Sequence, residues 1–316
     1  MRLAGPSRVL YPIRCRTVRA SLRRELRWLA NEALALQPVQ GPPLQYIAAE
    51  TVAEAIALMG NGGAVVAGGT TIVPGLLDDP RPGTIIDITK IPDLRAVQDS
   101  GKDIQIGAAV SLERAAEVLA AHPSLRAAHD AASAIGNPHI RRLATVGGNI
   151  CGGKDQVKDL TTALVALDGR VAVADANGTN TMAITAFLTA AASASRLVTA
   201  ITIPISGDRR SSFTKFAWRR TSAPAILNAA AAARISDGRL HDVRIAVGAT
   251  AIIPVRIRTA EAMLEGQMLD AAKIAEAATT CARATPVHRL TFTTADYVRS
   301  ALARVMRDVI SDLQAT

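Results

Sequence analysis

Cysteine and aromatic residues are scarce in this 316-residue chain, which has three cysteines and 3% aromatic residues. Cys15, Cys151 and Cys281 lie far apart and form no C-x-x-C pair, so by themselves they cannot hold an iron–sulfur cluster or a four-ligand zinc site. Such an odd and sparse set is typical of a reducing compartment, and we expect a cytoplasmic location. With so few aromatic rings, small aliphatic side chains must dominate the core.

Long apolar runs are also absent. The alanine-rich stretches 186–201 and 228–235 are too short or too polar to cross a bilayer, which takes about 20 apolar residues. We therefore expect no membrane span. The five histidines show no metal-ligand spacing, so the sequence predicts no metal site in this chain. It indicates no catalytic residue acting as a general acid or base either.

Positive charge is concentrated at one end of the chain. The formal net charge is +9, and residues 1–42 contribute +6 of it, because eight arginines there are opposed only by Glu25 and Glu32. We interpret this Arg-rich N-terminal extension as a disordered appendage or a start-site artefact, and we expect no nucleic-acid partner. The alternatives are a basic arm that binds nucleic acid or a membrane surface, and an organelle transit peptide.

Two short segments combine paired glycines with small polar side chains. Gly68-Gly69 is followed by two threonines, and residues 145–149 read TVGGN. Glycine permits positive φ and close approach of a ligand, consecutive N–H groups bind anions, and hydroxyls add donors. Neither segment matches G-x-G-x-x-G or G-x-x-x-x-G-K-[ST], which disfavours a nicotinamide Rossmann site and a P-loop. We predict that both loops, each following an apolar strand, offer main-chain amides to one dinucleotide pyrophosphate.

The periodicity of apolar residues predicts a mixture of helices and strands. The predicted helices are 51–63, 111–123, 124–136, 258–282 and 294–313. The predicted strands are 64–69, 83–91, 103–110 and 195–205, with a helix followed by a strand in 159–175 and an antiparallel hairpin turning at Asp237-Gly238. These elements divide the chain after the extension into three regions, 43–108, 109–207 and 208–316.

Five segments occur in the order typical of one known family. They are AGGTTIVPGL (67–76), GNPHIRRLATVGGNI (136–150), DLTTALVALDGRV (159–171), PVRIRTAEAML (254–264) and TADYVRSALARVMRDVI (294–310). Over about 43–313 the chain resembles the FAD-binding medium subunit of the molybdenum hydroxylases, the family of the carbon monoxide dehydrogenase and xanthine dehydrogenase medium subunits. His139 stands where the family usually has Gln. The resemblance implies an α+β fold, with a two-part FAD-binding αβ domain of the PCMH type followed by a C-terminal α+β domain of antiparallel sheet and helices.

The resemblance also implies a cofactor, non-covalent FAD, and its binding residues. The pyrophosphate clamps would be formed by Ala67, Gly68, Gly69, Thr70 and Thr71 and by Thr145, Gly147, Gly148 and Asn149. Asp159 would contact the cofactor or cap a helix, and Ile135 and Val198 would give apolar contacts to the flavin or adenine, or pack in the core. Lys215 and Arg219 lie near a segment that reaches the cofactor in the family, and the alternative is that they form a solvated charge pair.

By the same resemblance, the partners are a molybdopterin-binding large subunit and a [2Fe-2S] small subunit, assembled as a dimer of heterotrimers. This chain would pass electrons from the clusters through FAD to an external acceptor, and molybdopterin and clusters would reside only in the partners. Lys154, Gln156 and Lys158 replace a small, Ser-Pro-containing stretch of many relatives, which predicts a more basic site and a higher flavin potential. A stand-alone FAD-dependent oxidase of the PCMH fold is the alternative, and the scarcity of aromatics disfavours it.

Overall fold

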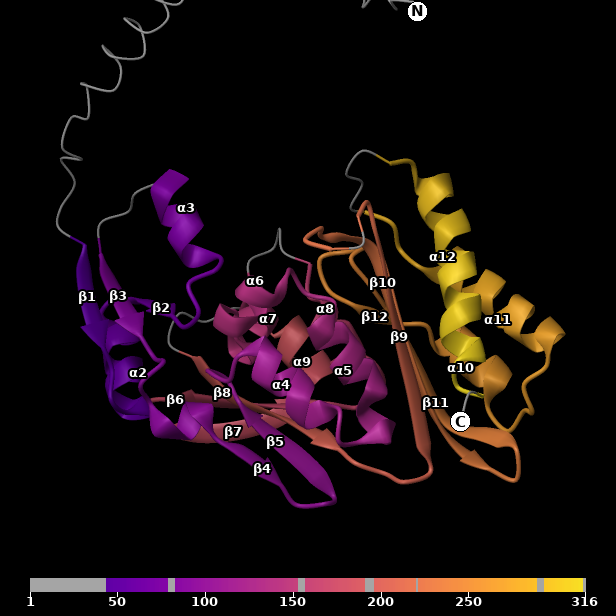
Figure 1. Cartoon of the computed structure of the whole chain (residues 1–316), viewed down its shortest axis with the longest axis horizontal. Helices are drawn as coiled ribbons and strands as arrows, with labels where there is room; N and C mark the ends of the chain where they lie inside the picture. Colours follow the sequence, from indigo (N-terminus) through magenta and orange to yellow (C-terminus); the bar gives the residue numbers. More distant parts are fainter. Residues whose placement is uncertain are drawn as a thin grey trace, which may run out of the picture. The chain divides into compact units, whose positions relative to one another are not determined.

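The computed structural model of the chain describes residues 44–78, 83–152, 157–190, 196–219, 221–288 and 293–314. The predicted N-terminal extension therefore lies outside the described residues. The described elements form three sheets, each built from a separate stretch of sequence (Figure 1).

The first sheet consists of three parallel strands in the order β1 (Gln45–Ala48), β3 (Thr84–Asp87) and β2 (Ala64–Val66). Helix α2 (Val52–Gly60) connects β1 to β2 and begins at Thr51, whose side chain accepts a hydrogen bond from the Glu54 amide at 3.1 Å. A polar N-cap of this kind stabilises a helix start by about 1 kcal/mol. The first glycine pair follows β2 directly, and α3 (Ile72–Asp78) follows the glycines.

The second sheet has five antiparallel strands in the order β4 (Val97–Asp99), β5 (Asp103–Gly107), β8 (Leu197–Pro204), β6 (Arg170–Asp175) and β7 (Gly178–Ala183). Single-turn 3₁₀ helices lie at Pro92–Arg95 and Pro123–Leu125. The α-helices of this stretch are α4 (Leu112–Leu119), α5 (Arg126–Ser133), α6 (Pro138–Leu143), α7 (Val146–Cys151), α8 (Asp159–Ala166) and α9 (Ile184–Thr189). Every residue of α8 is buried, so this helix forms the centre of the largest core cluster.

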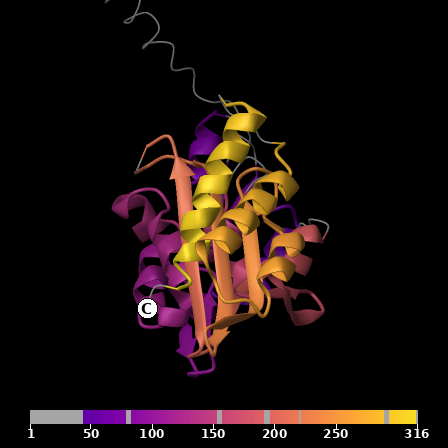
Figure 2. The ribbon, with the colours of Figure 1, turned by 90° about the vertical axis from the view of Figure 1, so that its right-hand side faces the viewer.

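The third sheet is antiparallel, in the order β12 (Val255–Arg256), β11 (Arg239–Gly248), β10 (Ala225–Ser236) and β9 (Arg209–Ala217). The predicted hairpin turn at Asp237-Gly238 is confirmed, and both residues have positive φ. Helices α10 (Arg258–Leu264), α11 (Ala271–Ala284) and α12 (Ala295–Ser311) belong to the same stretch. Figure 2 shows α11 and α12, in yellow and gold, lying across one face of the orange strands.

The alanine run of β10 is buried on both faces of this sheet. Ala230 and Ala232 pack into the core that contains α5 and α8, whereas Ala229, Ala231 and Ala233 pack against α10 to α12. Alanine favours helices when it is isolated from tertiary contacts. Here the alternation of a strand places small side chains on both faces, where helices approach closely.

Two predicted elements differ from the structure. The predicted single helix at 258–282 is two helices, because Gly266 adopts a left-handed φ of 70° and Asp270 caps the start of α11. The second glycine pair does not follow a strand, since Thr145 is the N-cap of α7 and the short helix α6 precedes it. Both errors arise from capping residues that interrupt an otherwise apolar pattern.

Candidate functional site

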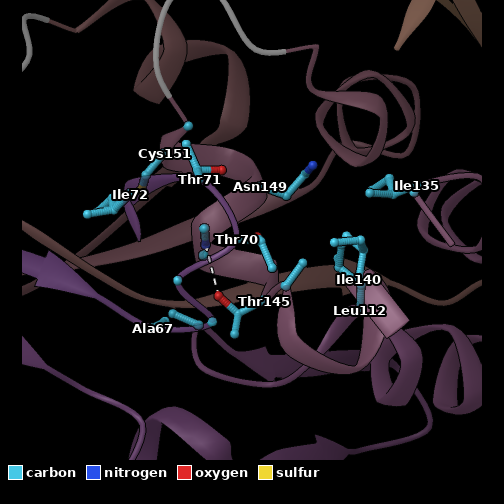
Figure 3. Close-up of a pocket in the computed structure, with 18 of the residues that line it drawn as sticks. Ala67, Thr70, Thr71, Ile72, Leu112, Ile135, Ile140, Thr145, Asn149 and Cys151 are labelled. Carbon is cyan, nitrogen blue, oxygen red and sulfur yellow. Dashed lines mark hydrogen bonds between the residues drawn. The ribbon is translucent and has the colours of Figure 1, made fainter. Parts of the chain in front are cut away.

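One cavity of about 790 Å³ collects all of the site residues proposed from the sequence (Figure 3). It is lined by Ala67, Gly68, Gly69, Thr70, Thr71, Ile135, Thr145, Gly147, Gly148, Asn149, Asp159, Val198 and Lys215. These residues come from the loop between β2 and α3, from the helices, their connections and β8 of the second stretch, and from β9. The two glycine loops thus face a common space, although almost eighty residues separate them.

The two glycines of the first loop are each required for a different physical reason. Gly69 has a φ of 68°, which side-chain-bearing residues rarely adopt. Gly68 is packed against the end of α6, which leads into the second loop, because a Cβ placed on it would lie 2.5 Å from the carbonyl carbon of Leu143 and closer still to the oxygen. Within the described part of the chain, the amides of Gly68, Gly69, Thr70 and Thr71 donate no hydrogen bond. Four consecutive main-chain donors are therefore available to an anion.

The second glycine loop corrects the prediction that both loops offer main-chain amides. The Gly147 amide donates to Ala108 O at 2.8 Å, the Gly148 amide to Thr145 Oγ1 at 3.2 Å, and the Asn149 amide to Thr145 O at 3.0 Å. The Gly148 and Asn149 bonds form the first turn of α7, and the Gly147 bond joins this turn to Ala108, so all three amides are already used. The pair is required by close packing instead, since a Cβ on Gly147 would lie 2.8 Å from the Ala108 Cβ.

What the second loop presents to the cavity is a side chain. Asn149 Oδ1 is buried and has no hydrogen-bond partner within the described residues. A buried polar atom without a partner costs about 1–3 kcal/mol, and this atom belongs to a residue of the cavity wall. Figure 3 shows Asn149 and Ala67 among the lining residues, with Thr70 and Thr145 between them in this view.

Apolar side chains make up much of the remaining wall. Ile135 is half-buried and Val198 is buried, and both line the cavity. The sequence interpretation did not single out several other lining residues, namely Ile72, Ile88, Leu112, Ile140, Leu197, Ser222 and Pro224. Most are ordinary apolar residues in helices and strands, so nothing local distinguishes them from core residues. Ser222 is the exception, because its φ of 54° marks a strained turn.

Asp159 and Lys215 form a buried ion pair at one wall of the cavity. Their charged atoms are 2.7 Å apart, and their side chains are only 4% and 12% exposed. Lys215 Nζ also donates to Ala134 O at 3.0 Å, so the predicted alternative of a solvated lysine is wrong. The alternative of Asp159 as a helix cap is also wrong, because Lys158 occupies the N-cap position of α8. Burial raises the pKa of Asp159, and the charge and hydrogen bond of Lys215 and a hydrogen bond from Asn228 oppose that rise.

Cys151 and Lys158 lie near the same wall. Cys151 lines the cavity, and desolvation raises the pKa of its thiol to about 11, a shift that the nearby charge of Lys158 reduces. Burial lowers the pKa of Lys158. The prediction of a more basic site also named Lys154 and Gln156, which lie outside the described residues.

The cavity fits FAD in size and in chemistry. Ligand pockets span roughly 300–1,000 Å³, and the cavity falls in this range. It combines four unused amides for a pyrophosphate, an unpartnered amide oxygen, apolar surfaces for ring systems, and a buried ion pair. In the part of the chain that the structure describes, no group of three or more metal-ligating side chains is found, and no helix has the length and apolar character that a bilayer crossing demands.

Comparison with known proteins agrees with this description. Residues 42–206 match the family model for the FAD-binding domain in molybdopterin dehydrogenase, and residues 212–312 match the model for the CO dehydrogenase flavoprotein C-terminal domain. The fold and the cavity thus define a two-part flavoprotein of the oxidoreductase class. The chain belongs to the family of FAD-binding medium subunits of the molybdenum hydroxylases, and FAD is its cofactor.

Curated relatives are similar over most of their length. The nicotinate dehydrogenase FAD-subunit of Eubacterium barkeri is 29% identical over 216 residues, covering 65% of this chain and 73% of that protein. The xanthine dehydrogenase FAD-binding subunit of Escherichia coli O157:H7 is 29% identical over 227 residues, covering 68% and 77%.

Solved structures share the fold. The carbon monoxide dehydrogenase of Hydrogenophaga pseudoflava superposes with a TM-score of 0.77 at 24% identity, over 87% of this chain and 99% of that one. Quinoline 2-oxidoreductase of Pseudomonas putida 86 gives a TM-score of 0.78 at 20% identity, over 87% and 98%. The α+β fold expected from the sequence, with its C-terminal antiparallel sheet and helices, is confirmed.

Proposed function

We propose that this chain is the electron-transfer subunit of a molybdenum hydroxylase complex, and that it passes electrons from [2Fe-2S] clusters of a small partner subunit through FAD to an external acceptor. A large partner subunit would hold molybdopterin and act on the substrate. The complex would be a dimer of such heterotrimers in the cytoplasm. One observation carries the proposal, namely a single cavity lined both by Gly68 to Thr71, whose amides are unused, and by Asn149, whose side-chain oxygen has no partner within the described residues.

In this proposal the chain binds and orients the cofactor. The amides of Gly68 to Thr71 and the hydroxyls of Thr70 and Thr71 would hold the pyrophosphate, while Ile135 and Val198 would contact the ring systems. When bound, FAD supplies redox chemistry that links one-electron and two-electron carriers. The apolar wall excludes water, and in a poorly solvated site the Asp159–Lys215 pair acts on the flavin potential more strongly than it would in water.

The surroundings support an electron carrier more than an enzyme with its own substrate. Within the described residues, the titratable side chains that line the cavity are Asp159, Lys215, Cys151 and Arg196. Asp159 and Lys215 are paired with each other, and the Cys151 thiol has a raised pKa. A general base must have a pKa near the working pH and reach the substrate, and this set offers no evident one.

Purification of the tagged chain from its native host tests the proposal. We expect it to co-purify with two further chains, and the complex to contain molybdenum, iron and FAD. Removal of FAD from the complex should leave cluster reduction intact, as followed by electron paramagnetic resonance, and should stop the onward reduction of NAD⁺ or a quinone. A chain that purifies alone, with bound flavin that a substrate reduces directly, would instead identify a stand-alone oxidase.

A further inference from the structure

Two consecutive hydrogen bonds in the core connect buried side chains to the Asp159 carboxylate from behind the cavity wall. Asn228 Nδ2 donates to Asp159 Oδ1 at 2.6 Å, and Thr162 Oγ1 donates to Asn228 Oδ1 at 2.8 Å. Asn228 and Thr162 are fully buried, and neither lines the cavity. The cavity wall is therefore supported from behind by two polar side chains in the core.

The chemistry of the groups determines the direction of these bonds. A carboxylate in an ion pair only accepts, so Asn228 turns its NH₂ group toward Asp159 and its oxygen away. That oxygen requires a donor, and the Thr162 hydroxyl lies at hydrogen-bonding distance. Thr162 also approaches the Lys158 carbonyl, but at 3.5 Å, so its single proton goes to the much shorter contact with Asn228.

The main chain of β11 packs directly against the Thr162 and Asn228 side chains. Gly248 is the register partner of Asn228 on the neighbouring strand. A Cβ on Gly248 would collide with Thr162 Oγ1 and with Asn228 Oδ1, so only glycine fits there. The absence of a side chain at Gly248 therefore leaves the space in which Thr162 and Asn228 form their hydrogen bond.

The bonds join two segments of the chain. Asp159 and Thr162 belong to α8, whereas Asn228 and Lys215 belong to β10 and β9 of the C-terminal sheet. Both side chains that donate hydrogen bonds to the Asp159 carboxylate, the charged Lys215 and the neutral Asn228, therefore come from the C-terminal segment. Correct placement of Asp159 in the cavity wall depends on the docking of that sheet against α8.

We infer that Thr162 and Asn228 are positioning residues, which hold the Asp159–Lys215 pair in the orientation that FAD requires. The C-terminal segment thereby contributes to cofactor affinity through residues that never touch the cofactor. The inference rests on the proposed role of Asp159 and Lys215 at the FAD cavity. Because it concerns binding only, it is independent of the electron acceptor and of the partner subunits.

Two adjacent threonines provide a matched test. Thr161 and Thr162 are both fully buried in α8, but the Thr161 hydroxyl has no hydrogen-bond partner within the described residues, whereas the Thr162 hydroxyl donates to Asn228. Thr161→Val and Thr162→Val remove the same atom from the same helix. The Kd for FAD of the full-length chain is measured by quenching of flavin fluorescence, and the Tm of the FAD-free chain is measured in parallel.

We expect Thr162→Val to raise the Kd for FAD about threefold to tenfold, because the net free energy of one hydrogen bond corresponds to about that ratio of dissociation constants. Thr161→Val should leave the Kd within about twofold, and Thr162→Ser should restore it because the hydroxyl returns. Asn228→Leu should raise the Kd about tenfold or more, because it removes a hydrogen bond to a charged group.

Equal values of Kd for the two valine variants would overturn the inference. So would a fall in the Tm of the Thr162→Val chain with an unchanged Kd, because the hydroxyl would then serve stability alone. If the Asn228→Leu variant does not fold, the comparison of Kd between Thr161→Val and Thr162→Val still tests the inference. A wild-type chain that binds no FAD would refute the assignment of the cavity itself, and this result precedes any comparison of variants.

Discussion

Replacing Gly68 with alanine should separate the two loops that enclose the cavity. The added Cβ would lie 2.5 Å from the carbonyl carbon of Leu143, whereas ordinary contacts between carbon atoms begin near 3.5 Å. The neighbour is main chain rather than a flexible side chain, so it cannot turn aside. One loop must therefore move by about 1 Å relative to the other.

The size of the effect follows from the kind of strain. Overpacking in a well-packed region costs about 1–3 kcal/mol, which corresponds to several degrees in Tm for a chain of this length. A displacement of about 1 Å would also break hydrogen bonds from this loop to a bound pyrophosphate, and a hydrogen bond to a charged group contributes about 1.5–3 kcal/mol, or roughly tenfold to a hundredfold in Kd. We expect Gly68→Ala to lower the Tm of the FAD-free chain and to raise the Kd for FAD.

Gly75→Ala is the matched control. Gly75 lies in α3 a few residues further on, and a Cβ there would meet nothing within 4 Å. Alanine in a helix stabilises relative to glycine by up to about 1 kcal/mol, so this variant should be neutral or slightly stabilised and should bind FAD normally. Gly68→Ala with wild-type Tm and Kd would refute the packing of the first loop against Leu143.

Three further predictions concern charge and composition. Asp159→Asn and Lys215→Met should each lower the free energy of unfolding in urea by about 3–5 kcal/mol, because each leaves a buried group unpaired. The double variant should lower it by less than the sum of the two single effects. Additive effects on the free energy of unfolding would contradict the ion pair. Alkylation of Cys151 by iodoacetamide, measured by mass spectrometry, should be about a hundredfold slower at pH 8 than alkylation of a free cysteine, because only the thiolate reacts. Its rate should keep rising with pH up to the pKa of about 11. A rate that levels off below pH 9 would exclude the raised pKa. A chain lacking residues 1–42 should retain FAD with an unchanged Kd, and loss of flavin on this truncation would assign the arginine-rich extension a role in the cofactor site.

Residue type and order along the chain were enough to predict the family, the cofactor and thirteen of the residues that line the cavity. The glycine pairs, the five ordered segments and the turn at Asp237-Gly238 are local signals, and each depends on only a few neighbouring residues. The alternating burial of the alanine run 229–233 is not such a signal. Alanine propensity alone favours a helix, and only the flanking pattern of a hairpin indicates a strand.

The sequence by itself therefore determined a set of residues that line one cavity, because binding motifs are short and contiguous. The tertiary structure alone decided what each residue contributes. It showed that the first loop keeps its amides unused while the second uses its own in α7, and that Lys215 is buried against Asp159 instead of solvated. It also brought Asn228 and Thr162 behind that pair. The physical reason is that hydrogen-bond partners and burial depend on residues distant in the chain, whose approach no local pattern encodes.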